Sequence, residues 1–160
     1  TAVDRMRQLR GIDEKHLLTL LCRDLSELSQ YAQVDNRQFR FLKEWTPGAY
    51  TFILPATREV PRRLMHPSRK TVGLRVPEAP IVQALLAELG VPLLCASLIL
   101  PGDEDPLSDP DDIEDRIGKR IDLLVDGGAG QLEATSVIDV TGDEPVIQRV
   151  GLGPVEAMLR

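Results

Sequence analysis

Arginines and short hydroxyl side chains are the residues of this sequence best suited to chemistry. They lie near the ends of the strands and turns that the sequence predicts. Guanidinium groups bind phosphate and carboxylate oxygens through two parallel hydrogen bonds, and serine or threonine hydroxyls complete such a site without adding charge. We therefore predict a site for a ligand that carries phosphate or carboxylate. The candidate residues are Arg10, Thr51, Arg75, Ser97, Thr135, Ser136 and Arg149.

Other kinds of site have little support in the sequence. A strand-end arginine also commonly pairs with a nearby acidic side chain, so each candidate arginine taken alone also fits a structural role. The glycine-rich runs 127–130 and 151–153 lack the spacing of a phosphate loop or a dinucleotide fingerprint. His16 and His66 have no second ligand at a metal-binding spacing, and Ser97 lacks the flanking glycines of a nucleophile elbow. We assign no metal site and no catalytic nucleophile.

Composition restricts the class of protein further. A chain of 160 residues that is 42% hydrophobic and 28% charged is ordinary for a compact domain, which excludes disordered, collagen-like and disulfide-rich classes. The net charge of −6 excludes a uniformly basic nucleic-acid binder. However, residues 1–75 carry 14 basic and 8 acidic side chains, whereas residues 76–160 carry 5 and 17. A polyanion is therefore expected to approach the first half.

Cysteine content and hydropathy bear on the compartment. Cys22 and Cys95 lie far apart in apolar runs, as reduced core thiols do, and this favours a cytoplasmic protein. No apolar stretch approaches the ~20 residues of a membrane helix, so no membrane association is expected. The oligomeric state has no signal in the sequence.

Periodicity predicts a regular alternation of helices and strands. Helices are expected over residues 3–9, 25–32, 36–45 and 80–89, from Pro110 to about Gly118, and after Pro154. Strands are expected over residues 17–22, 50–54, 71–76 and 91–97, the last of them buried. Three shorter strands are expected near Leu123, Val137 and Ile147, with a turn at residues 142–143 between the last two. The pattern predicts a single α/β domain over residues 1–160, built on an open mixed sheet with flanking helices.

Five blocks of sequence, in this order, resemble the signature blocks of the YrdC/YciO family. They are residues 46–54 (TPGAYTFIL), 72–77 (VGLRVP), 92–97 (PLLCAS), 135–139 (TSVID) and 149–151 (RVG). Residues 22–28 (CRDLSEL) and 98–102 (LILPG) are similar to the YciO branch. The family also carries a strand and a loop ahead of the position where this sequence begins, and we expect the natural chain to have them.

The resemblance implies a twisted, open α/β sheet with a concave, positively charged face that binds nucleotide and double-stranded RNA. Active members of the family make threonylcarbamoyl-AMP from L-threonine, bicarbonate and ATP, which is the first step of threonylcarbamoyladenosine formation in tRNA. A threonine-derived carbamate attacks the α-phosphate of ATP, and pyrophosphate leaves. Because charge builds on phosphate oxygens, positioned cations and Mg²⁺ supply the catalysis. ATP or AMP is thus the implied ligand, with Mg²⁺ as an accompanying ion.

Two departures from the family pattern affect the expected activity. The family's Lys-x-Arg motif falls on residues 8–10, where Arg10 is retained and Gln8 replaces the lysine. Its Ser-Thr-Ser-Ala-Asn block falls on residues 95–99, where Ser97 is retained and Ile99 replaces the asparagine. Each lost polar contact would cost on the order of 1–3 kcal/mol of transition-state binding.

Two functions are therefore the main candidates, and a third, an enzyme that acts on another carbamoylated or adenylated compound, also remains open. The first, which we favour, is a binding protein of the YciO type that engages nucleotide and RNA, either tRNA or another duplex. The alternative is an active threonylcarbamoyl-AMP synthase, a nucleotidyltransferase in tRNA modification. For the first, the predicted RNA-binding surface consists of Arg5, Arg7, Arg62, Arg63, Arg69 and Lys70.

Overall fold

The computed structural model describes residues 1–159, which form two compact units. Unit 1 consists of residues 1–13 and 96–134. Unit 2 consists of residues 14–95 together with the chain from residue 135 on. All six strands belong to unit 2, so this unit contains the sheet.

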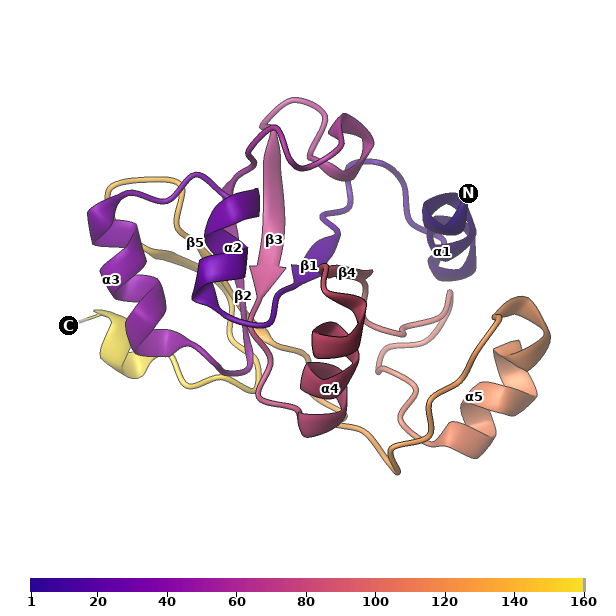
Figure 1. The fold of residues 1–160 in the computed structure, drawn as a ribbon. Helices are drawn as coiled ribbons and strands as arrows, with labels where there is room; N and C mark the ends of the chain where they lie inside the picture. The colour runs from indigo at the N-terminus through magenta and orange to yellow at the C-terminus, as the bar shows by residue number, and fades with distance from the viewer. Residues whose placement is uncertain (160) are drawn as a thin grey trace. The chain divides into compact units, whose positions relative to one another are not determined.

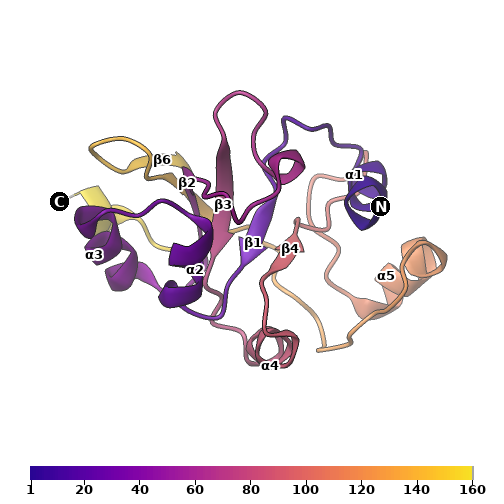
Figure 2. The same ribbon diagram turned by 45° about the horizontal axis from the view of Figure 1, so that its top comes forward.

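The strands of unit 2 form one mixed, open sheet in the order β4-β1-β3-β2-β5-β6. β1 runs parallel to β3, and β2 runs parallel to β5, whereas the other neighbours are antiparallel. Figure 2 shows β4, β1, β3 and β2 side by side. The predicted open mixed sheet is therefore confirmed. Its strands are β1 (Thr19–Leu21), β2 (Tyr50–Pro55), β3 (Thr71–Arg75), β4 (Leu93–Cys95), β5 (Ser136–Asp139) and β6 (Val146–Arg149).

Three α-helices of unit 2 begin and end where local sequence signals predict. α2 (Leu25–Tyr31) begins at Asp24, whose carboxylate accepts a hydrogen bond from the Glu27 amide at 2.8 Å. α4 (Pro80–Leu89) begins with proline in its first turn and ends at Gly90, which has a left-handed φ of 69°. α3 (Asn36–Trp45) lies between them in sequence, and the 3-10 helices are η1 (Arg62–Leu64) and η3 (Glu156–Leu159).

One face of the sheet packs into the core of unit 2. Leu74, Phe52 and Ile138 are fully buried on neighbouring strands and face the same side. They belong to one cluster with Leu28 of α2 and Leu42 of α3. Figure 1 shows α2 and α3 over this face of the sheet. The helix-covered face thus supplies the apolar core.

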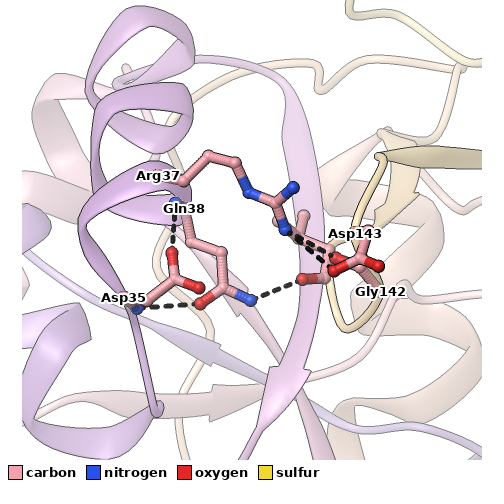
Figure 3. Close-up of polar contacts among 6 residues, drawn as sticks. Asp35, Arg37, Gln38, Gly142 and Asp143 are labelled. Atoms are coloured by element: carbon pink, nitrogen blue, oxygen red, sulfur yellow. Dashed lines mark hydrogen bonds and ion pairs between the residues drawn. The ribbon is translucent and has the colours of Figure 1, made fainter.

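α3 is attached at its N-terminus to the turn between β5 and β6 (Figure 3). Gln38 and Asp35 form a capping box, with the Gln38 side-chain oxygen accepting from the Asp35 amide at 2.8 Å. The Gln38 amide group also donates to the Val140 carbonyl at 2.7 Å. Arg37 makes longer contacts, to the Gly142 carbonyl at 3.4 Å and to the Asp143 carboxylate at 3.6 Å.

Unit 1 contains two α-helices and a short 3-10 helix. α1 (Ala2–Arg10) ends at Gly11, whose φ of 63° lies in the left-handed region, as predicted for a glycine at a helix end. α5 (Pro110–Ile117) begins at the cap Asp109 and is followed at Gly118 by η2 (Gly118–Arg120). The sequence also predicts the ends of these helices.

Two details of the predicted secondary structure are wrong, and the type of one helix is now defined. Leu123 lies in a loop and is 79% exposed, because the short apolar run around it finds no partner strand. Within residues 91–97 only Leu93–Cys95 form a strand, and they are half-buried because β4 is at the edge of the sheet. The chain after Pro154 forms a 3-10 helix.

Candidate functional site

The face of the sheet opposite the apolar core carries four of the five polar candidates of unit 2. Side chains alternate along a strand, so residues flanking Phe52 and Leu74 point away from the core. Thr51 and Arg75 each lie one residue beyond the paired Phe52 and Leu74, on neighbouring antiparallel strands. The strand pairing therefore places these two candidates beside one another. We call this side of the sheet the polar face.

Thr51, Thr135 and Arg149 form a connected group on the polar face. The Thr51 and Thr135 hydroxyls are hydrogen-bonded at 2.7 Å. Two nitrogens of Arg149, Nε and Nη2, donate to the Thr135 carbonyl at 3.0 and 2.8 Å. This engagement fixes the guanidinium plane and leaves Nη1 without a protein partner among the described residues. We call these three residues the Thr–Arg clamp.

Ser136 supports the clamp from the core side. Its side chain is fully buried. The hydroxyl donates to the Gly153 carbonyl at 2.5 Å and accepts from the Gly151 amide at 2.9 Å. Both functions of the hydroxyl are thus used to hold the chain just after Arg149. Ser136 positions that segment, and in this structure it offers no hydroxyl to a ligand.

The segment after Arg149 also packs closely on β2. The Tyr50 hydroxyl donates to the Pro154 carbonyl at 2.6 Å. A Cβ on Gly153 would lie 2.5 Å from the Tyr50 ring and 2.7 Å from the Ala49 carbonyl oxygen, so only glycine fits. These contacts fix residues 149–154 relative to β2 and β5.

Arg75 lies next to the clamp with part of its hydrogen-bonding capacity unused. Its Nε is buried and has no hydrogen-bond partner. Its guanidinium group interacts with the Cys95 thiol on β4. Burial raises the pKa of Cys95, and the nearby Arg75 partly offsets this effect. A buried guanidinium N–H without an acceptor is a feature that a bound anion would satisfy.

Arg10 and Ser97 lie together in unit 1. Arg10 is the last residue of α1, and its Nε donates to the Ile99 carbonyl at 2.7 Å. The Ile99 amide in turn donates to the Ser97 carbonyl at 2.9 Å. Partial burial lowers the pKa of Arg10. The seven predicted ligand residues therefore form two groups, Arg10 with Ser97 in unit 1 and the other five in unit 2.

Four of the six residues predicted to face RNA lie in one connection between β2 and β3. Arg62 and Arg63 are in η1, and Arg69 and Lys70 precede β3. The sequence analysis missed Arg58, which lies in the same connection. We call residues 58–70 the basic loop, in which Glu59 is the single acidic residue.

Arg5 and Arg7 lie on α1 of unit 1. The exposed guanidinium of Arg5 forms an ion pair with Asp122 of the same unit. This hydrogen-bonded pair raises the pKa of Arg5 and lowers the pKa of Asp122. The charge of Arg5 is thus locally compensated by a carboxylate.

Two further polar side chains on the polar face were missed by sequence reasoning. Thr19 on β1 is paired with both Gly73 on β3 and Cys95 on β4, so all three face the same side. Both Thr19 and Cys95 stand within apolar runs, where they read as core residues. Only the strand register places them beside Arg75.

Neither a metal-binding cluster nor a membrane-spanning helix is present in the part of the chain that the structure describes. Among residues 1–159 there is no group of three or more His, Cys, Asp or Glu side chains able to hold a metal ion. No helix within the same range is long and apolar enough to cross a membrane.

Comparison with known sequences gives a consistent family match. The Sua5/YciO/YrdC family model, described as "Telomere recombination", matches residues 1–151. The chain is 52% identical to the uncharacterized protein YciO of Escherichia coli strain K12 over 158 residues, covering 99% of this chain and 77% of that protein. It is 26% identical to a putative threonylcarbamoyl-AMP synthase of Methanocaldococcus jannaschii over 160 residues, covering 99% of this chain and 74% of that protein.

Solved structures agree with the sequence comparison. The crystal structure of E. coli YciO matches with a TM-score of 0.94 and 52% identity, covering 98% of this chain and 76% of that one. The crystal structure of P. abyssi Sua5 complexed with L-threonine matches with a TM-score of 0.87 and 26% identity. It covers 98% of this chain and 46% of that one.

Proposed function

Because the chain belongs to the Sua5/YciO/YrdC family, we propose that it binds a nucleotide, ATP or AMP, on the polar face and RNA on the basic loop. The observation that carries the nucleotide assignment is the Thr–Arg clamp beside Arg75. Two guanidinium groups there combine with threonine hydroxyls at the ends of neighbouring strands. Ligands of open α/β sheets commonly bind at such strand ends.

The hydrogen bonds of the clamp suit a phosphate group. Arg149 is held by two bonds to the Thr135 carbonyl, so little side-chain entropy is lost when its remaining N–H groups meet an anion. The buried Nε of Arg75 lacks an acceptor, and a phosphate oxygen supplies one. A guanidinium group is a cation with donors only, which favours an anionic ligand over a neutral one.

Titration of the protein with ATP and AMP by calorimetry tests this assignment. We expect binding by the wild-type protein and a loss of about tenfold or more in affinity for Arg149→Gln, since a charge-assisted hydrogen bond contributes ~1.5–3 kcal/mol. Arg40→Gln removes an equal charge from the surface of α3 and is the matched control. No ATP or AMP binding by the wild-type protein would refute the nucleotide assignment.

RNA binding is supported by the charge of the basic loop. Five cationic side chains against one acidic side chain lie within 13 consecutive residues. Such a cluster contacts phosphates without requiring a base sequence, as duplex RNA recognition does. We expect tRNA and a plain RNA duplex to be retained at 50 mM salt and largely released at 200 mM, because phosphate contacts displace counterions. Retention that does not depend on salt, or no retention, would exclude this role.

The second candidate function is threonylcarbamoyl-AMP synthesis. It is supported by the names of the M. jannaschii relative and of the P. abyssi structure with L-threonine, and by the retention of Arg10 close to Ser97. Gln8 and Ile99 stand against it. The test is pyrophosphate release from ATP and bicarbonate that depends on L-threonine. If such release occurs and Arg10→Ala abolishes it, the protein is an enzyme; if wild type releases none, it is not this synthase.

A further inference from the structure

Residues 66–70 form a closed turn at the end of the basic loop, directly before β3. The His66 amide donates to the Thr71 carbonyl at 2.9 Å, and the Lys70 amide donates to the His66 carbonyl at 3.0 Å. Among the described residues, Lys70 is the one non-glycine residue with a positive φ, which is 55°. This left-handed conformation is unfavourable for a residue with a side chain, so the contacts around Lys70 have to hold it there.

The imidazole ring of His66 supplies contacts of this kind. Its Nδ1 lies 3.3 Å from the Ser68 amide nitrogen and 3.2 Å from the Arg69 amide nitrogen. The Ser68 Oγ lies 3.3 Å from the same ring atom. A backbone amide can only donate, so Nδ1 accepts these bonds and the neutral ring carries its proton on Nε2. One ring nitrogen therefore holds the two amides that precede Lys70.

Protonation of the ring removes this acceptor. A histidinium ring carries a proton on both nitrogens and can only donate hydrogen bonds. The Nδ1 proton would then face the amide protons of Ser68 and Arg69, so the charged ring would repel the groups that the neutral ring holds. Histidine is the side chain whose ordinary change of charge falls between pH 5 and 8. The contact is therefore sensitive to pH in this range.

The charged side chains of the basic loop are mostly cations. They are Arg58, Arg62, Arg63, Arg69 and Lys70. The acidic residue of the loop, Glu59, comes seven residues before His66. The residues that bond to the turn from β2 and β3, Ala56 and Thr71, are uncharged. Within the described part of the chain no carboxylate is bonded to the His66 ring, so none would hold a charged ring in place.

The closed turn orients two cations of the basic loop. The Lys70 Nζ donates to the Pro67 carbonyl within the turn and keeps further N–H donors for a ligand. The Arg69 side chain starts from the backbone that the His66 ring holds. A cation that is already oriented loses less side-chain entropy when it meets a phosphate.

We propose that His66 is a pH-sensitive switch of the basic loop. The neutral ring keeps residues 66–70 closed and so positions Arg69 and Lys70 for RNA phosphates. The protonated ring lets the turn open, and the two cations lose their fixed orientation. The positioning of Arg69 and Lys70 rests on the proposed RNA binding, whereas the opening of the turn is independent of it.

NMR spectroscopy of the full chain tests the opening of the turn. In a residue with a left-handed φ the Hα and the amide proton lie close together and give a strong nuclear Overhauser effect. We expect this signal for Lys70 in the wild-type protein at about pH 7.5 and its loss at about pH 5.5. His66→Asn supplies a side-chain oxygen that accepts from the following amides and does not titrate, so the signal should be strong at both pH values. His66→Ala should lack the signal at both.

His16→Asn is the matched control, because it removes the other histidine of the chain. Its Lys70 signal should depend on pH as in the wild-type protein, and thermal unfolding of each variant checks that the fold is intact. A wild-type signal that is the same at both pH values, or a strong signal in His66→Ala, would overturn the switch. A loss in His66→Asn equal to that in the wild type would also overturn it, since another group would then be titrating.

Affinity for a plain RNA duplex tests the positioning role separately. It is measured at about pH 7.5, so that a charged ring does not itself attract the RNA. We expect His66→Ala to weaken binding by about threefold or more, because Arg69 and Lys70 are then ordered only on binding, and His66→Asn to stay within about twofold of wild type. Equal affinities of wild type and His66→Ala would refute the positioning role and leave RNA binding in place. If the wild-type protein binds no RNA, the proposed RNA function fails, and the Lys70 signal still decides whether His66 opens the turn.

Discussion

Ser136 is a predicted ligand residue, but in the structure its hydroxyl holds the chain next to Arg149, which is the residue placed to contact a ligand. Both hydrogen-bonding functions of its hydroxyl are used by backbone groups of the Arg149–Gly153 segment. Such a hydroxyl is costly to remove, because its buried partners are left without water or protein to satisfy them. Removing the Ser136 hydroxyl therefore affects the ligand site indirectly, through the position of Arg149, which lies two residues before Gly151.

We expect Ser136→Ala to lower the free energy of unfolding by about 1–3 kcal/mol, because two buried backbone groups lose their partner. ATP affinity should fall as well, since the orientation of Arg149 is no longer fixed. Urea unfolding and calorimetric titration measure the two effects separately. Ser29→Ala is the control: its hydroxyl donates to the Leu25 carbonyl within α2 at 2.8 Å, a bond that adds little to the helix. Equal effects of the two substitutions would contradict the positioning role.

The Arg5–Asp122 ion pair gives a pH dependence with a definite sign. The hydrogen bond and charge of Arg5 lower the pKa of Asp122 below its ordinary value of 3.8. A carboxyl whose pKa is lowered in the folded state stabilises that state above its ordinary pKa. This contribution is lost as the pH falls through the lowered value. Because both side chains are exposed, the effect should be small and sensitive to salt.

We expect Arg5→Gln to return the pKa of Asp122 to its ordinary range, as measured by NMR titration of the side-chain carboxyl carbon. Arg120→Gln removes an equal charge from the nearby 3-10 helix and should leave the Asp122 titration close to that of wild type. An Asp122 pKa that is already ordinary in the wild-type protein, or one unmoved by Arg5→Gln, would show that the pair does not form in solution.

At the level of secondary structure elements, α3 is fixed by its first turn. Gln38 closes the capping box with Asp35 and also reaches the Val140 carbonyl, so one side chain ties the helix start to the end of β5 (Figure 3). Arg37, one residue earlier, reaches the same turn only through long, exposed contacts. Two neighbouring residues of one helix turn therefore differ in how much they stabilise the attachment of α3 to the β5–β6 turn.

We expect Gln38→Ala to cost about 1–2 kcal/mol of unfolding free energy, because it removes two short hydrogen bonds at once. Arg37→Ala should cost less than about 0.5 kcal/mol, as exposed ion pairs usually do. Chemical denaturation of the two variants under the same conditions makes the comparison. A larger loss for Arg37→Ala would mean that the turn is held mainly by charge.

The elements were more predictable than the site they form. Caps and glycine terminators act within one turn, so Asp24, Asp35, Gly11 and Gly90 could be recognised from neighbouring residues alone. The hydroxyl–arginine candidates could also be recognised by type. Strand register depends on contacts between segments far apart in the sequence, so the nearness of Thr19 to Arg75 and the burial of Ser136 could not. Leu123 was misjudged for a related reason, since a strand needs a partner.

At the level of the whole molecule, the charge asymmetry along the sequence is redistributed by the fold. Unit 1 contains 6 basic and 13 acidic side chains, whereas unit 2 contains 13 and 12. Arg5 and Arg7 therefore belong to a strongly acidic unit, which repels a polyanion. The basic loop belongs to the nearly neutral unit 2 and concentrates its positive charge. This is why we assign RNA binding to the basic loop.

The salt dependence of RNA binding tests that assignment. Each phosphate contact changes the slope of log affinity against log salt by about 0.7–0.9. Replacing Arg62, Arg63, Arg69 and Lys70 by glutamine should therefore reduce the slope by up to about 3.6 and weaken binding to any sequence. The control is Arg37→Gln with Arg40→Gln, which removes two exposed charges from α3 and should leave the slope nearly unchanged. If the control flattens the slope as much per charge as the loop variant does, RNA contacts a diffuse positive surface rather than the basic loop.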